Sequence, residues 1–179
     1  MKHRAKGFTL IETVVSMLIV VMLSLVIVTA TRTALNVRSD EEYASESELL
    51  AATVNIALGD VLHFAQYSPE TQHSGDVPAF TNRGYGILKG HLLLKDGRFY
   101  INATDCDDSD ANATLLSLVS KGTYTSSTIT DFTMHYDEAT QLFTGTYTIR
   151  GSRPQQIKEV TFAFRTLNEA EKQADAAEN

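Results

Sequence analysis

One carboxylate stands inside a long apolar stretch near the amino terminus. Glu12 follows an apolar opening and precedes Thr13–Thr31, a segment in which no residue is charged. Close to the end of a membrane helix, an ionised carboxylate costs about 1–3 kcal/mol, so residues of this kind usually have a cationic partner. The chemistry that Glu12 could do is therefore ion pairing in a medium of low dielectric, where breaking a pair is strongly unfavourable.

A second group of carboxylates lies close together in the middle of the chain. The segment DCDDSD contains Asp105, Asp107, Asp108 and Asp110. Calcium takes about 6–8 oxygen ligands, so such a cluster could contribute to a calcium site. The spacing departs from the EF-hand pattern, because Asp110 stands where that loop needs glycine and Leu116 where it needs glutamate. We therefore expect a solvated acidic loop, with a weak calcium site as the alternative.

The other reactive side chains form no recognisable catalytic or zinc-binding pattern. The five histidines are His3, His63, His73, His91 and His135. No two of them have the spacing of a zinc motif, and the chain contains no nucleophile elbow, phosphate-binding loop or H-E-x-x-H sequence. We therefore expect a protein that is not an enzyme and that uses no cofactor.

The chain has one cysteine, Cys106, and so cannot form an intrachain disulfide. An unpaired, partly exposed thiol is the favoured interpretation, and a bridge to a second chain is the alternative. The cysteine count therefore does not indicate in which redox compartment the protein works.

The placement of Glu12 depends on a helix that can cross a membrane. As a helix, Thr13–Thr31 is about 28 Å long, close to the thickness of a hydrocarbon core. Lys2, Arg4 and Lys6 precede it, which favours a cytoplasmic amino terminus and an exported body. The chain has a net charge of −7, and its acidic body offers no basic patch, so we expect no direct contact with nucleic acid.

The same helix should continue beyond the apolar segment. Because no proline occurs before Tyr67 and Gly59 is the only glycine after Gly7 in this region, we expect a helix from about Phe8 to about Gln66. Its second half carries an apolar stripe made of Tyr43, Ser47, Leu50, Val54, Ala57, Val61 and Phe64. This stripe is typical of a helix that packs on the protein's own sheet, and a coiled coil with another protein is the alternative.

The remainder of the chain predicts an antiparallel sheet. Polar residues, glycine and proline predict a loop over residues 68–83, and the Asp96–Gly97 pair predicts a type I′ hairpin between residues 91–95 and 98–102. Alternating apolar residues predict a second pair of strands around a turn at residues 137–141, and one more strand within residues 157–167. The segment 111–120 could be a short helix or a strand.

The stretch KGFTLIE, from Lys6 to Glu12, resembles the processing signal of type IV pilins and pseudopilins. In that family a short basic leader ends in glycine, a prepilin peptidase cuts after it, and the next residue, usually Phe, is N-methylated. Gly7 matches the cleavage glycine, Phe8 the new amino terminus, and Glu12 the glutamate at the fifth mature position. Many pilins also have a helix-kinking proline near the twenty-second mature position, where this chain has Thr29.

The resemblance implies a fold and a set of partners. The fold is α+β: one long amino-terminal helix, membrane-spanning in its first half and amphipathic in its second, packed on a carboxyl-terminal antiparallel β-sheet. In the family, the glutamate is thought to meet the terminal amine of a neighbouring subunit, which here would join Glu12 to Phe8. The implied partners are a prepilin peptidase, other pilin or pseudopilin subunits, an assembly platform with its ATPase, and the membrane. The filament would be a type IV pilus, a type II secretion pseudopilus or a competence pseudopilus, with this chain as a minor pilin or a pseudopilin.

These observations divide the chain into a leader (1–7), a membrane and filament-core half of the helix (8–31), an amphipathic half (32–67), a β-sheet head (68–168) and an acidic tail expected to be disordered (169–179). The expected location is the cytoplasmic membrane, with the amino terminus inside and the head outside, and then an extracytoplasmic filament. Two alternatives are a secretory signal peptide cut at Val28–Ala30 and a plain membrane anchor for an extracytoplasmic binding domain. The mature amino terminus separates the three, because it is Phe8 for a pilin, Thr31 for a secreted protein and Met1 for an anchor.

Overall fold

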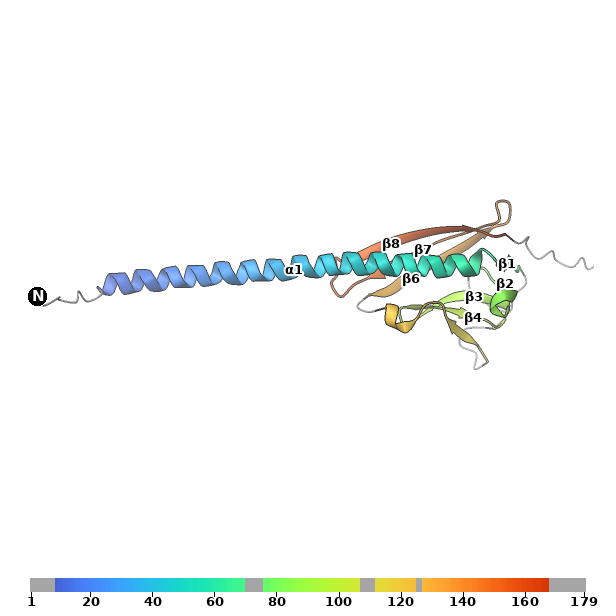
Figure 1. Ribbon diagram of the computed structural model, residues 1–179, viewed down its shortest axis with the longest axis horizontal. Coiled ribbons are helices and arrows are strands. Elements are labelled where there is room, and N and C mark those ends of the chain that lie inside the picture. Colours follow the sequence, from blue (N-terminus) through green and yellow to red (C-terminus); the bar gives the residue numbers. More distant parts are fainter. Residues whose placement is uncertain (1–8, 70–75, 107–111, 125–126, 168–179) are drawn as a thin grey trace, which may run out of the picture. The chain divides into compact units, whose positions relative to one another are not determined.

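The computed structural model describes residues 9–69, 76–106, 112–124 and 127–167 (Figure 1). These residues form one long helix, α1 (Leu10–Leu62), two short 3₁₀ helices and eight strands. By compactness the chain divides into two units, residues 1–42 and 43–179, and α1 contributes to both. The predicted acidic tail at residues 169–179 lies outside the described residues.

Helix α1 forms because its sequence contains almost no helix breaker. Gly59 is the only glycine in Leu10–Leu62, and this range contains no proline. The sequence predicts a helix that continues to about Gln66, whereas α1 ends at Leu62. The prediction of a long amino-terminal helix is confirmed, and its predicted end is wrong by about one turn.

The reason for this early end is a pair of tertiary hydrogen bonds to carbonyls at and just beyond the end of the helix. The side-chain amide of Asn82 donates to the carbonyl oxygen of Val61 at 2.7 Å. The backbone N–H of Leu167 donates to the carbonyl oxygen of His63 at 2.8 Å. Distant residues thus satisfy carbonyls that the next helical turn would otherwise use.

A five-stranded antiparallel sheet follows α1 in the second unit. Its strands are β1 (Gln66–Tyr67), β2 (Phe80–Asn82), β3 (Ile87–Lys95), β4 (Arg98–Asn102) and β5 (Leu115–Ser117), and they lie side by side in this order. β2 falls inside the predicted loop at residues 68–83, so that prediction is wrong at its carboxyl end. β2 is held by pairing with β1 and β3 rather than by a strand-like sequence of its own. The segment 111–120, for which the sequence left a short helix or a strand open, contains strand β5.

Strands β3 and β4 form the hairpin that the sequence predicts. Asp96 and Gly97 both have positive φ, 51° and 70°, as a two-residue type I′ turn requires. The register pairs Lys95 with Arg98 directly across the turn. The prediction from the Asp-Gly pair is therefore confirmed.

A second, three-stranded antiparallel sheet completes the head. It contains β6 (Thr128–Asp137), β7 (Leu142–Arg150) and β8 (Ile157–Arg165), with β7 in the centre. Of the two 3₁₀ helices, η1 (Arg83–Tyr85) lies between β2 and β3 in the chain, and η2 (Lys121–Thr123) lies between β5 and β6. The predicted turn at residues 137–141 and the predicted last strand are both confirmed.

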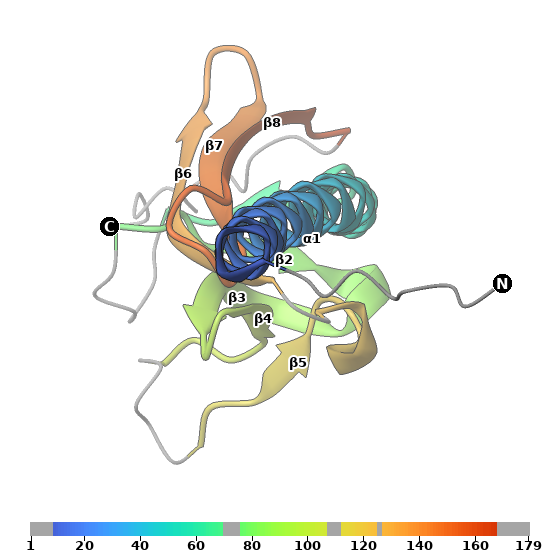
Figure 2. The ribbon, with the colours of Figure 1, turned by 90° about the vertical axis from the view of Figure 1, so that its left-hand side faces the viewer.

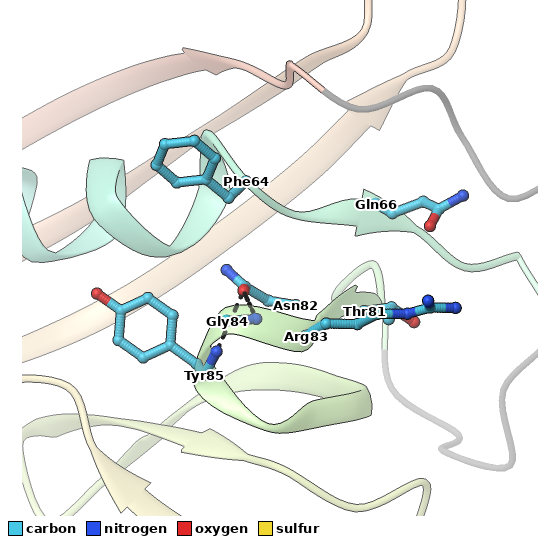
Figure 3. Close-up of a pocket in the computed structure, with 7 residues that line it drawn as sticks. All are labelled: Phe64, Gln66, Thr81, Asn82, Arg83, Gly84 and Tyr85. Atoms are coloured by element: carbon cyan, nitrogen blue, oxygen red, sulfur yellow. Dashed lines mark hydrogen bonds between the residues drawn. The ribbon is translucent and has the colours of Figure 1, made fainter.

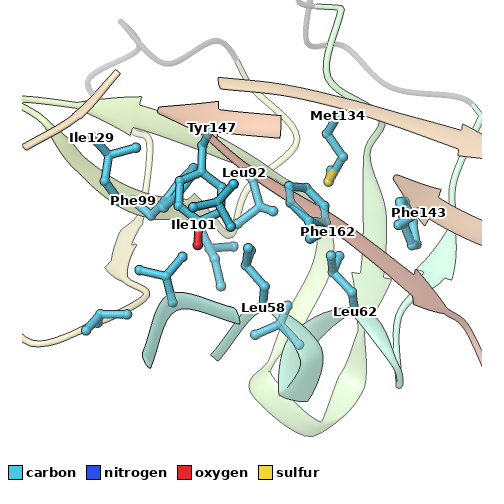
Figure 4. Packing of buried hydrophobic residues seen from close by; sticks show 14 of the residues in the cluster. Leu58, Leu62, Leu92, Phe99, Ile101, Ile129, Met134, Phe143, Tyr147 and Phe162 are labelled. Carbon is cyan, nitrogen blue, oxygen red and sulfur yellow. The ribbon is translucent and has the colours of Figure 1, made fainter. Parts of the chain in front are cut away.

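The second half of α1 shares one hydrophobic core with both sheets. Figure 2 looks along the helix and shows β6–β8 and β3–β5 on different sides of it. The buried helix residues of this core are Leu50, Ala51, Val54, Leu58, Val61 and Leu62. Leu58 and Leu62 lie among aromatic side chains of the sheets, such as Phe143 and Tyr147 (Figure 4). The sheets therefore hold the head half of α1 by burial of apolar surface.

The predicted apolar stripe is correct for most of its length. Leu50, Val54 and Val61 are buried, as expected for a helix that packs on the protein's own sheet. Phe64 is the exception, because 58% of its surface is exposed. Since the helix ends two residues earlier, Phe64 no longer follows the helical spacing, and its prediction as a core residue is wrong.

Two tyrosines tie the central strand β7 to α1. The hydroxyl of Tyr147 donates to the side-chain oxygen of Asn55 at 3.1 Å and lies 3.3 Å from the carbonyl oxygen of Ala51. The hydroxyl of Tyr43 donates to the carbonyl oxygen of Ile149 at 2.9 Å. Burial of the ring raises the pKa of Tyr147 well above its usual range, because the phenolate would lose its hydration.

The stability of the head should therefore fall at alkaline pH in a way that depends on Tyr147. A raised pKa in the folded state means that the stabilisation is complete below the unfolded-state pKa of about 10 and is lost as the pH rises beyond it. We expect Tyr147→Phe to destabilise the head by about 1 kcal/mol at neutral pH, through the lost hydrogen bond. Above about pH 10 the stability of the native head should fall relative to that of the variant by about 1.4 kcal/mol per pH unit, so the difference should close within about one pH unit and then reverse. Urea unfolding at neutral and alkaline pH measures the difference in unfolding free energy between the variant and the native protein. Tyr85→Phe, at the exposed Tyr85, is the control. A difference that stays constant with pH would contradict the expectation.

Candidate functional site

Glu12 lies in the first turn of α1. Its backbone N–H donates to the carbonyl oxygen of Thr9 at 3.0 Å, and the N–H of Thr13 donates to the same oxygen at 3.2 Å. The carboxylate therefore stands near the positive end of the helix dipole, where a negative charge is favoured. Gly7 and Phe8, the predicted cleavage and methylation residues, lie outside the described residues.

The helix around Glu12 presents its apolar side chains to the exterior on every side. All described residues from Thr9 to Arg38 are exposed, and the large apolar side chains in the range 10–28 expose between 47% (Val28) and 84% (Leu10) of their surface. Among the described helices, α1 is the one that is long and apolar enough to cross a membrane. So much exposed apolar surface is unfavourable in water, so lipid or other helices must cover it.

The hydroxyl groups in this apolar segment are satisfied within the helix itself. Ser24 donates to the carbonyl oxygen of Val20 at 2.8 Å. Thr31 donates to the carbonyl oxygen of Ile27 at 2.9 Å. This bonding to the preceding turn removes the need for an external polar partner, and it lets such residues enter lipid or a helix bundle at little cost.

Glu12 differs from these residues. It is the only charged residue from Thr9 to Thr31, and its carboxylate makes no hydrogen bond or ion pair within the part of the chain that the structure describes. A carboxylate in an apolar medium needs a donor or a cation. The described residues do not supply one to Glu12.

The acidic cluster gains no support from the structure. Asp105 is described, whereas Asp107, Asp108 and Asp110 lie outside the described residues. Within the described ranges, no three His, Cys, Asp or Glu side chains come together as a metal site. The neighbouring Cys106 is a free, partly exposed thiol, and its sulfur lies 3.0 Å from the hydroxyl oxygen of Thr104.

The structure also reveals a groove that the sequence does not predict. It lies where α1 ends, has a volume of about 530 Å³, and is flanked by the rings of Phe64 and Tyr85 (Figure 3). No motif signals it, because its residues come from the segments on either side of a loop. The only hint in the sequence is a cluster of glycine, arginine and tyrosine at residues 83–86.

Comparison with known proteins bears on the amino-terminal site. Residues 2–28 match the family model described as the prokaryotic N-terminal methylation motif. The comparisons with curated proteins and with solved structures gave no match. The matched range contains Gly7, Phe8 and Glu12, the three residues that the sequence analysis selected.

This motif is the signature of type IV prepilins, so the chain carries the amino-terminal signal of a pilin-like precursor. The signal implies processing by a prepilin peptidase and assembly with other pilin subunits. Proteins of this class are structural subunits rather than enzymes. Together with the long helix and the antiparallel sheets, the motif confirms the resemblance from which the fold was predicted.

Proposed function

We propose that the chain is the precursor of a structural subunit of a type IV filament, either a minor pilin or a pseudopilin. A prepilin peptidase cuts after Gly7 on the cytoplasmic side of the membrane, and Phe8 becomes the N-methylated amino terminus. The observation that carries this proposal is the carboxylate of Glu12, which has no partner among the described residues, in an exposed apolar helix within the matched motif. The subunit is not an enzyme and needs no cofactor.

Cleavage would create the partner that Glu12 lacks. The new amine on Phe8 is cationic, and Glu12 lies four residues, about one helical turn, away from it. In a bundle of such helices, the amine of one subunit can reach the carboxylate of its neighbour. Because an unpaired charge in a low-dielectric bundle is strongly unfavourable, the pair would make one axial register favourable and displaced registers costly.

The apolar helix then has two successive environments. Before assembly, lipid covers it, with the leader cations Lys2, Arg4 and Lys6 on the cytoplasmic side. After assembly, the helices of other subunits cover it, and the head remains on the extracytoplasmic side. An assembly platform and its ATPase would move the subunit from the first environment to the second. The filament is a type IV pilus, a type II secretion pseudopilus or a competence pseudopilus.

Blocking the cleavage tests this proposal. In cells that contain a prepilin peptidase, the Gly7→Leu variant should keep its leader and stay in the membrane fraction, because the variant lacks the glycine after which the peptidase cuts. Ala5→Leu, a matched change in the same leader, should be processed normally. Intact mass spectrometry of the purified proteins distinguishes the two forms. Equal processing of both variants would contradict the proposal.

A further inference from the structure

The groove at the end of α1 is lined by the kinds of side chain that are common in ligand-binding sites. Its lining consists of Phe64, Gln66, Thr81, Asn82, Arg83, Gly84 and Tyr85. The two aromatic side chains expose 58% and 51% of their surface, although rings of this size are normally buried. Figure 3 shows the two rings toward one end of the groove and the side chains of Gln66 and Arg83 toward the other. Aromatic walls combined with a few polar groups are typical of small-molecule sites.

A buried asparagine fixes the shape of this groove. Asn82 exposes 1% of its surface, and its amide nitrogen donates to the carbonyl oxygen of Val61 in α1. Its side-chain oxygen accepts hydrogen bonds from the backbone N–H groups of Gly84 (3.1 Å) and Tyr85 (3.4 Å). One side chain thus locks η1, which carries Tyr85, to the end of the helix. The groove is therefore preformed, which lowers the entropic cost of binding.

The polar groups of the groove are available for a ligand. Neither the amide of Gln66 nor the guanidinium of Arg83 has a hydrogen bond or ion pair within the described part of the chain. Arg83 is also the only ionisable lining residue apart from the tyrosine, in a chain whose net charge is −7. The charge of Arg83 therefore favours an anionic group, and its planar guanidinium can bind a carboxylate through two hydrogen bonds.

The geometry points to a site for a carboxylated sugar, such as a uronic acid unit of an acidic polysaccharide. The apolar C–H face of a pyranose ring would lie against the exposed faces of Phe64 and Tyr85. The sugar hydroxyls would bond to the amide of Gln66, and the carboxylate would pair with Arg83. A single acidic sugar unit thus uses the aromatic walls, the neutral amide and the cation together.

The groove belongs to the second unit of the chain. It lies at the end of the docked part of α1, about 30 Å along the helix from Tyr43, where the second unit begins. The proposed ion pair of Glu12 belongs to the other unit, so sugar binding does not depend on the proposed filament role.

The test uses the full-length protein in nanodiscs of neutral phosphatidylcholine, titrated with trigalacturonate by isothermal titration calorimetry. We expect saturable binding, weakened about tenfold by Arg83→Gln through loss of the charge-assisted contact, and about tenfold by Tyr85→Ala. Leu88→Ala, at an exposed apolar residue outside the lining, should bind like the native protein. Thermal unfolding of each variant confirms that the fold is intact.

Two further ligands make the result decisive. Maltotriose, which has the rings without the carboxylates, should bind at least about tenfold more weakly than trigalacturonate. Hexaglutamate, which has the carboxylates without the rings, should not bind measurably. The absence of trigalacturonate binding, equal binding by the Arg83→Gln variant, or preferential binding of hexaglutamate would each overturn the assignment.

Discussion

The Glu12→Leu variant should be processed normally and yet fail to enter filaments. Leucine suits a membrane helix better than glutamate, so insertion and cleavage after Gly7 should proceed. In the filament, however, the amine on Phe8 of a neighbouring subunit would then be buried without a carboxylate. Removing one partner of a buried ion pair costs about 3–5 kcal/mol, which corresponds to a loss of incorporation of about a hundredfold or more.

Competition between native and variant subunits measures this effect. Cells that express both forms, distinguished by mass, should yield sheared filaments that contain almost only native subunits, while the membrane fraction contains both. Glu41→Leu is the matched control, since Glu41 is an exposed glutamate on the same helix but outside the apolar segment. Incorporation of the Glu12→Leu variant at the level of the control would remove the role assigned to the carboxylate.

The second large effect is expected in the head, at Gly145 in the central strand β7. A Cβ atom at this position would lie 2.2 Å from the backbone oxygen of Thr133 and 2.5 Å from the Phe162 ring. The first of these contacts is with backbone, so no change of a side-chain rotamer can relieve it. Strand β6 is irregular here, because its register shifts between Thr130 and Thr133 and Asp131 has a φ of 53°. A glycine in a strand often marks such a close approach of two backbones.

Gly145→Ala should therefore destabilise the head by about 3 kcal/mol or more, the upper part of the range for overpacked cores. The matched control is Gly122→Ala in η2, where the added Cβ meets nothing within 4 Å. Urea unfolding of the full-length protein in detergent, followed by tyrosine fluorescence, compares the two variants with the native chain. A loss below about 1 kcal/mol at Gly145 would show that β6 can move away, contrary to the packing described for it.

Local sequence signals were sufficient for the elements that local chemistry determines. The Asp96–Gly97 pair specifies its own turn, because few other residue pairs adopt positive φ twice in succession. The absence of proline and the near-absence of glycine specify α1 in the same way. These elements could be predicted without knowledge of their partners.

The features that were missed all depend on residues far apart in the sequence. α1 ends early because Asn82 and Leu167 donate hydrogen bonds to carbonyls at and just beyond its end, and neither residue can be connected with the helix from sequence alone. That early end exposes Phe64, which periodicity placed in the core, and thereby creates one wall of the groove. The groove could not be predicted from the sequence because it depends on the early end of α1, which also made the predicted stripe wrong at Phe64.

The amino-terminal site was predictable to a different degree. The types and spacing of Gly7, Phe8 and Glu12 are encoded in one short stretch, so the sequence was enough to select them. The sequence does not identify a partner for Glu12, and the described part of the chain contains no group that pairs with it. In the proposed filament, a second subunit would supply that partner, as the amine on its Phe8.

The most direct test is the identity of the amino-terminal residue of the native protein. It would be purified from cells that make the prepilin peptidase and examined by Edman degradation and intact mass spectrometry. The account predicts a chain that starts at Phe8 and carries one methyl group on its terminal nitrogen. A chain that still starts at Met1, or one that starts at Thr31, would contradict it.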